Sequence, residues 1–210
     1  MVISMRHKAF VLAPAFLLLG VLAMKFGWKP NPDLDWSVAF PLWTGAHLAY
    51  IAGNVAFAFV LVTLWRWGRE AARSGFERGA VHVLSALGAV GLVAMIGQMV
   101  IDLLVAFEAD DRAGMSAISD RYHDLPGVDA FFYGAIPGMH LGATALLLVL
   151  LAVRRRIAVW PAGLALAASL AIATQLTPLM VAGGAGLLVS LYAIARAEQV
   201  GTRVPVGAAD

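Results

Sequence analysis

The chain has 210 residues, of which 61% are hydrophobic and 13% are charged, and its formal net charge is +2. A soluble domain is usually about 45–50% apolar and about 25% charged, so this composition excludes an ordinary soluble domain and indicates a membrane protein. The sequence has no cysteine, which excludes disulfides, thiolate metal sites, iron–sulfur clusters and cysteine nucleophiles. The net charge is too small to indicate a nucleic-acid partner.

Six apolar stretches follow one another along the chain, and most reach the ~17–25 residues that a helix needs to cross a bilayer. In chain order they cover residues 9–24, 38–65, 80–107, 130–153, 157–176 and 179–195. We therefore predict an all-α fold, a polytopic membrane helix bundle with six transmembrane helices. They form a single domain over residues 1–198, and the tail at 199–210 is predicted to be disordered.

The charges between these stretches predict the orientation of the bundle. Arginine and lysine concentrate at residues 6–8, 66–78, 154–156 and 196–203, whereas the connections at 25–36 and 108–129 hold most of the acidic residues. Positive residues accumulate on the cytoplasmic side of membrane proteins, so six alternating helices place both termini in the cytoplasm. The alanine- and arginine-rich composition is similar to that of proteins from high-GC bacteria, which predicts the bacterial inner membrane as the location.

The first stretch has a second interpretation. A basic start, a short apolar core and the small residues around Gly20 are also typical of a cleaved signal peptide. Its removal would leave five spans and an outer N-terminus.

The connection at 108–129 is not apolar enough to insert into a membrane. Within it, Met115, Ile118, Tyr122 and Leu125 recur at helical spacing. Residues 112–125 are therefore predicted to form a short amphipathic helix on the outer surface.

Ionisable residues inside the predicted spans are the main functional candidates, because a charge in hydrocarbon is costly and usually functional. We predict His47, Asp102 and His140 as catalytic residues, whereas His82 lies near the cytoplasmic end of its span and is interpreted as structural. Polar neighbours on the same helix faces, or at an outward helix end, are predicted to bind a ligand: Tyr50, Asn54, Gln98, Tyr133 and Gln175. Since lipid offers no polar partners, these stripes are expected to surround a pocket in the outer half of the bilayer.

Pro137 lies in the fourth stretch, with Gly134 and Gly138 beside it. Proline removes a backbone donor from a helix and bends it. We expect a kink that widens the bundle just above His140.

Several chemistries fit these residues. A histidine beside a carboxylate supports general acid–base catalysis on a small or lipidic substrate, and the same groups form a proton relay in transporters. His47 and His140, at similar expected depth, are also candidates for the two axial ligands of a b-type haem. Together with Asp102 they would form a metal site with two nitrogens and one oxygen.

The segment 131–166 resembles part of a broad group of bacterial six-helix membrane proteins of similar length. The resemblance rests on Gly138–Met139–His140, on the three arginines at 154–156, and on Pro161 opening the next helix. The remaining chain matches that group only in span number and loop lengths. The group has no settled activity, so the resemblance implies an architecture and no reaction.

Three functions stay open at this point. The first is a membrane protein that binds a small or lipidic ligand in the pocket, with or without acid–base catalysis. The second is a non-catalytic membrane subunit that contacts a protein partner through its basic loop at 66–78. The third is a haem electron-transfer protein. The oligomeric state is also open.

Overall fold

The computed structural model describes residues 5–31 and 33–201, and within them every regular element is helical. In chain order the elements are α1 (Met5–Leu22), the π-helical turn η1 (Ala23–Trp28), α2 (Trp36–Ala71), α3 (Gly75–Glu108), α4 (Arg112–His123), the π-helical turn η2 (Asp129–Tyr133), α5 (Met139–Val153), α6 (Val159–Ala173) and α7 (Thr177–Gly201). The predicted all-α fold is therefore confirmed. Residues 202–210, most of the predicted disordered tail, lie outside the described residues.

Four helices among the described residues are long and apolar enough to cross a membrane: His7–Trp28, Trp36–Ala71, Gly75–Glu108 and Thr177–Gln199. The chain is thus a helical membrane protein. Helices α5 and α6 have 15 residues each, which gives a length of about 22 Å against a hydrocarbon core of about 30 Å. The number of six spans stays a prediction.

The fourth predicted stretch is not one helix. The chain leaves η2 at Gly134, whose ψ of −149° is not helical, and α5 begins only at Met139. Pro137 lies in the irregular segment between them and has no backbone N–H to continue a helical ladder. A full break of the helix thus replaces the expected kink.

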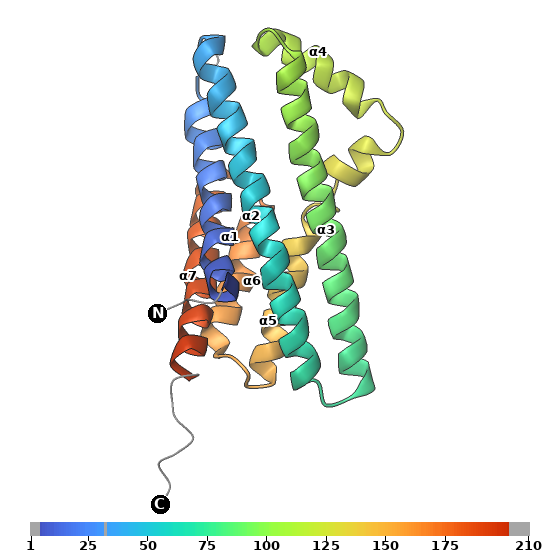
Figure 1. Ribbon diagram of the computed structural model, residues 1–210, viewed down its shortest axis with the longest axis vertical. Coiled ribbons are helices and arrows are strands. Elements are labelled where there is room, and N and C mark those ends of the chain that lie inside the picture. The colour runs from blue at the N-terminus through green and yellow to red at the C-terminus, as the bar shows by residue number, and fades with distance from the viewer. Residues whose placement is uncertain (1–4, 32, 202–210) are drawn as a thin grey trace, which may run out of the picture.

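The helices form an up-and-down bundle (Figure 1). The start of α1, the end of α7 and the α2–α3 and α5–α6 connections lie toward one end, and α4 lies at the other. We call these the arginine end, after the arginines at 66–78 and 154–156, and the α4 end. Helices α1, α2 and α3 reach the α4 end, whereas α5, α6 and α7 occupy the other part of the bundle (Figure 1).

Side-chain caps fix where the long helices begin. Asp35 caps α2 by accepting a hydrogen bond from the Ser37 backbone N–H at 2.8 Å. Ser74 caps α3 by accepting from the Glu77 N–H at 3.2 Å, and Glu77 accepts in turn from the Arg73 N–H at 2.8 Å. Such reciprocal caps satisfy helix donors that have no partner within the helix.

Ion pairs hold the arginine end together. Arg154 pairs with Glu77 of α3, and Arg156 makes a two-bond contact with Glu198 of α7 at 2.5 and 3.1 Å. Two of the three arginines in the α5–α6 connection therefore fix that connection to neighbouring helices.

A hydrophobic cluster, with several aromatic side chains packed against it, fills the α4 end. Its buried members are Trp28, Ala39, Val105, Ala106, Ala109 and Met115. The Arg112 guanidinium lies 4.2 Å from the Trp28 ring centroid and donates to the Asn31 carbonyl at 2.8 Å. The Tyr122 hydroxyl donates to Glu108 at 2.5 Å, and this bond raises the pKa of the Tyr122 phenol. Helix α4 is thereby fixed to both η1 and α3.

Arg112→Ala is expected to destabilise the protein by about 1–2 kcal/mol, because it removes a cation–π contact and a charged hydrogen bond. Thermal unfolding in detergent micelles measures this as a drop of a few degrees in the midpoint. The matched control is Arg121→Ala, which removes an ion pair whose arginine is 68% exposed and costs at most about 1 kcal/mol. Equal midpoints for the two variants would contradict the role of Arg112.

Candidate functional site

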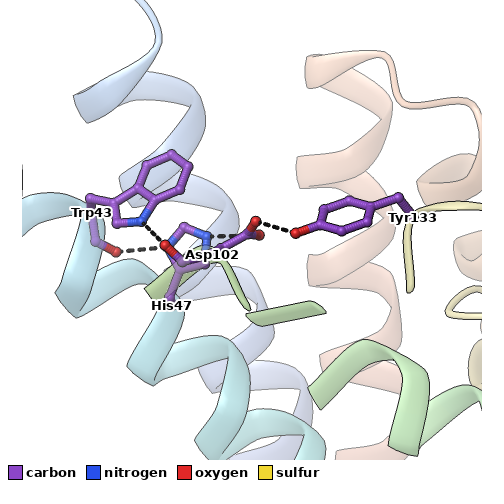
Figure 2. Close-up of polar contacts among 4 residues, drawn as sticks. All are labelled: Trp43, His47, Asp102 and Tyr133. Carbon is purple, nitrogen blue, oxygen red and sulfur yellow. Dashed lines mark hydrogen bonds and ion pairs between the residues drawn. The ribbon is translucent and has the colours of Figure 1, made fainter. Parts of the chain in front are cut away.

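The Asp102 carboxylate lies between two partners from different parts of the chain (Figure 2). One oxygen accepts a hydrogen bond from the Tyr133 hydroxyl at 2.8 Å, and the other lies 3.4 Å from Nε2 of His47. His47 comes from α2, Asp102 from α3 and Tyr133 from η2. We call Trp43, His47, Asp102 and Tyr133 the Asp102 network.

Trp43 holds the other side of this network. Its backbone carbonyl lies 2.8 Å from Nδ1 of His47, one helical turn further along α2, and its ring stacks on the imidazole at 4.2 Å between centroids. The Trp43 indole N–H also donates to the backbone carbonyl of Asp102 at 3.0 Å (Figure 2). One tryptophan therefore orients the imidazole and fixes α2 against α3 at the level of the carboxylate.

The contacts of His47 determine which ring nitrogen faces Asp102. A carbonyl oxygen only accepts, so Nδ1 of His47 donates its proton to the Trp43 carbonyl. Nε2 is then the ring atom on the side of Asp102, 3.4 Å from its carboxylate oxygen. An imidazole nitrogen beside a carboxylate is an arrangement that general acid–base catalysis uses.

The Asp102 network is more deeply buried at His47 than at Asp102. The His47 side chain is 3% exposed, whereas that of Asp102 is 16% exposed. Beyond Asp102, the Tyr133 ring stacks on the His123 ring at 4.1 Å between centroids, and His123 pairs with Asp129 at 3.0 Å. The network thus runs from a buried imidazole to polar side chains at the surface of the α4 end.

The structure places His140 apart from this network. Its Nδ1 lies 2.6 Å from the Pro137 carbonyl, and its ring meets the Phe57 ring edge-to-face at 5.7 Å. Phe57 lies about 15 Å further along α2 than His47, at ~1.5 Å per residue. The two histidines therefore do not lie at the similar depth that the sequence predicts. His140 is buried, and its Nε2 has no hydrogen-bond partner among the described residues.

The remaining sequence candidates divide between the core and the surface. Asn54 is buried and donates to the Tyr50 carbonyl at 2.8 Å, while the Tyr50 ring lies against Gly20 of α1. Gln98 is half-buried, one turn from Asp102 on α3. Gln175 is exposed in the α6–α7 turn with a φ of 59°. Of the polar neighbours predicted from the sequence, Tyr133 is the one bonded directly to Asp102.

These positions do not fit a haem ligated by both histidines. Axial ligands bind the same iron from opposite faces, whereas His47 contacts Trp43 and Tyr50 and His140 contacts Phe57, further along α2. His47, Asp102 and His140 also do not gather into one ligand set. Among the residues that the structure describes, no group of three metal-ligating side chains is close enough to hold an ion.

Sequence reasoning missed Trp43 and His123 as members of the site. Trp43 lies near an end of a predicted span, where tryptophan is common in any membrane protein. Its position one turn before His47 is the available signal, because that spacing puts a backbone carbonyl within reach of the imidazole. Nothing in the sequence around His123 indicates its stacking on Tyr133.

No protein-family model, curated protein or solved structure matches this chain. The site is therefore interpreted from its own geometry.

Proposed function

We propose that this membrane protein binds a small or lipidic ligand at the Asp102 network and exchanges a proton with it. The observation that carries the proposal is the Asp102 carboxylate held between the imidazole of His47 and the hydroxyl of Tyr133. An ionisable pair inside a membrane bundle is costly, and such pairs commonly mark proton-transfer sites.

The tryptophans of α2 support a position for the site at one membrane border. Trp65 donates to His82 of α3 at 3.2 Å, and Trp43 donates to Asp102 of α3 at 3.0 Å. On both helices about 30 Å separates these two levels, at ~1.5 Å per residue. That length equals the thickness of the hydrocarbon core, and tryptophan favours its two borders. The network then lies at the border nearer α4, shallower than the sequence alone suggests.

A border position suits a ligand that arrives from the membrane or from the outer aqueous side. In the ionised form the proton is on Nε2 of His47, and the exposed edge of the carboxylate accepts a further hydrogen bond from the ligand. In the neutral form the proton is on Asp102, and a basic ligand atom at its exposed edge takes it. The Tyr133 hydroxyl donates a hydrogen bond to the carboxylate and holds it in place. General acid–base catalysis and proton-coupled binding both use these two states.

Mass spectrometry of small molecules and lipids retained by the purified protein tests the proposal. Wild type is expected to retain a species enriched over the bulk membrane, and Asp102→Asn is expected to reduce that enrichment about tenfold or more, because a charged hydrogen bond is lost. Asp33→Asn is the control, since it makes the same charge change at an exposed position outside the network.

Equal enrichment in all three proteins would contradict the proposal. A stable protein partner without any enriched small molecule would instead favour the non-catalytic subunit. In that case the contact surface to test is the basic segment 66–78, which covers the end of α2 and the start of α3. Phe76 is exposed there beside Arg73 and Arg78.

A further inference from the structure

A cavity of about 560 Å³ lies between α1 and α7 at the arginine end, remote from the Asp102 network. Figure 1 shows the start of α1 beside α7 in this part of the bundle. The residues that the argument uses are His7, Lys8, Val11, Leu12, Tyr192 and Arg196.

The lining separates into a cationic rim and an apolar wall. On α1, Lys8 lies one turn nearer the helix start than Val11 and Leu12. On α7, Arg196 lies one turn nearer the helix end than Tyr192. Because the two helices run in opposite directions, both cations lie toward the arginine end and both apolar segments lie toward the middle of the bundle.

Within the described part of the chain, no acidic side chain forms an ion pair with Lys8 or Arg196. None of the described residues that line the cavity is acidic. The nearest acid along α7, Glu198, makes its two-bond contact with Arg156. Within residues 5–31 and 33–201, Lys8 and Arg196 form no ion pair, and both side chains are exposed.

The apolar wall is open toward the surroundings of the bundle. Leu12 is 44% exposed and Tyr192 is 50% exposed. In a bilayer such surfaces face acyl chains. The cavity thus offers charge at headgroup level and an apolar surface at acyl-chain level.

We propose that this cavity binds an anionic phospholipid from the leaflet at the arginine end. The phosphate lies between Lys8 and Arg196, with the imidazole of His7 as a further donor, and one acyl chain follows Leu12 and Tyr192. Basic pockets between transmembrane helices recognise anionic headgroups in this way. This binding is independent of the Asp102 network.

Native mass spectrometry of the full chain, titrated with phosphatidylglycerol or phosphatidylcholine, tests the proposal. Wild type is expected to bind phosphatidylglycerol in preference to phosphatidylcholine. The double variant Lys8→Gln/Arg196→Gln is expected to weaken phosphatidylglycerol binding about thirtyfold, from the loss of two charges near the membrane surface. Arg66→Gln/Arg78→Gln is the matched control, because it removes two exposed charges at the same end outside the cavity.

A third variant separates the cavity from surface charge. Val11→Trp fills the cavity and keeps every cation, so it is expected to weaken phosphatidylglycerol binding while leaving the unfolding midpoint near that of wild type. Equal weakening in the Arg66→Gln/Arg78→Gln control would overturn the proposal in favour of general surface charge. Equal binding of phosphatidylcholine by wild type would also overturn it, as would unchanged binding in a folded Val11→Trp variant.

Discussion

Gly91→Ala is expected to destabilise the protein by about 2 kcal/mol, the usual cost of overpacking a close helix contact. A Cβ at Gly91 would lie 2.5 Å from the backbone nitrogen of His140 and 3.1 Å from the carbonyl oxygen of Ile136. Both neighbours are backbone atoms, so neither moves aside by changing a rotamer. The start of α5 would have to shift away from α3. Chemical unfolding in mixed micelles measures the loss.

Gly45→Ala is the control for this change. Gly45 also lies inside a helix, but a Cβ there meets nothing within 4 Å. Alanine has the higher helix propensity, so Gly45→Ala is expected to be neutral or stabilising by up to about 1 kcal/mol. If both variants lost the same stability, the close α3–α5 contact at Gly91 would not be the cause of the loss.

The relative positions of Tyr133 and His140 could not be predicted from the sequence. Their spacing places them on one face of a helix only if that helix is continuous. The break at 134–138 uncouples them, so Tyr133 bonds to Asp102 on α3 while His140 turns toward Phe57 on α2. Pro137 and its neighbouring glycines are visible in the sequence, and they indicate a bend or a break equally well.

What selects the break is packing against a distant helix. Gly91 leaves room for the backbone at Ile136 and His140, and the ring of Phe132 lies over Gly97, six residues further along α3. The sequence alone does not assign these glycines to a contact, because nothing local says which segment lies against them. The apolar stretches and the charge pattern are local properties, and they predict the all-α membrane fold. The approach of η2 and α5 to α3 depends on contacts far apart in the sequence.

The His47–Asp102 pair is the second place where a large effect is expected. His47→Phe is expected to destabilise the protein by about 3 kcal/mol, because it leaves the mostly buried carboxyl group of Asp102 without its contact to Nε2 of His47. Asp102→Leu is expected to cost a similar amount, because it leaves the buried imidazole of His47 without its partner. In each single variant the loss of stability comes from the buried partner that is left without its contact.

Combining the two changes tests whether a proton is shared between them. If one proton lies between Nε2 and the carboxylate, the double variant His47→Phe/Asp102→Leu strands no charge and is expected to be less destabilised than the sum of the single variants by about 1–3 kcal/mol. Unfolding in mixed micelles gives all three values.

The exposed pair Arg121–Glu108, 3.1 Å apart at the same end, is the comparison cycle and is expected to couple by less than about 1 kcal/mol. Additive costs at His47 and Asp102, within about 0.5 kcal/mol, would mean that the 3.4 Å contact holds no shared proton, and the proposed proton exchange would lose its physical basis.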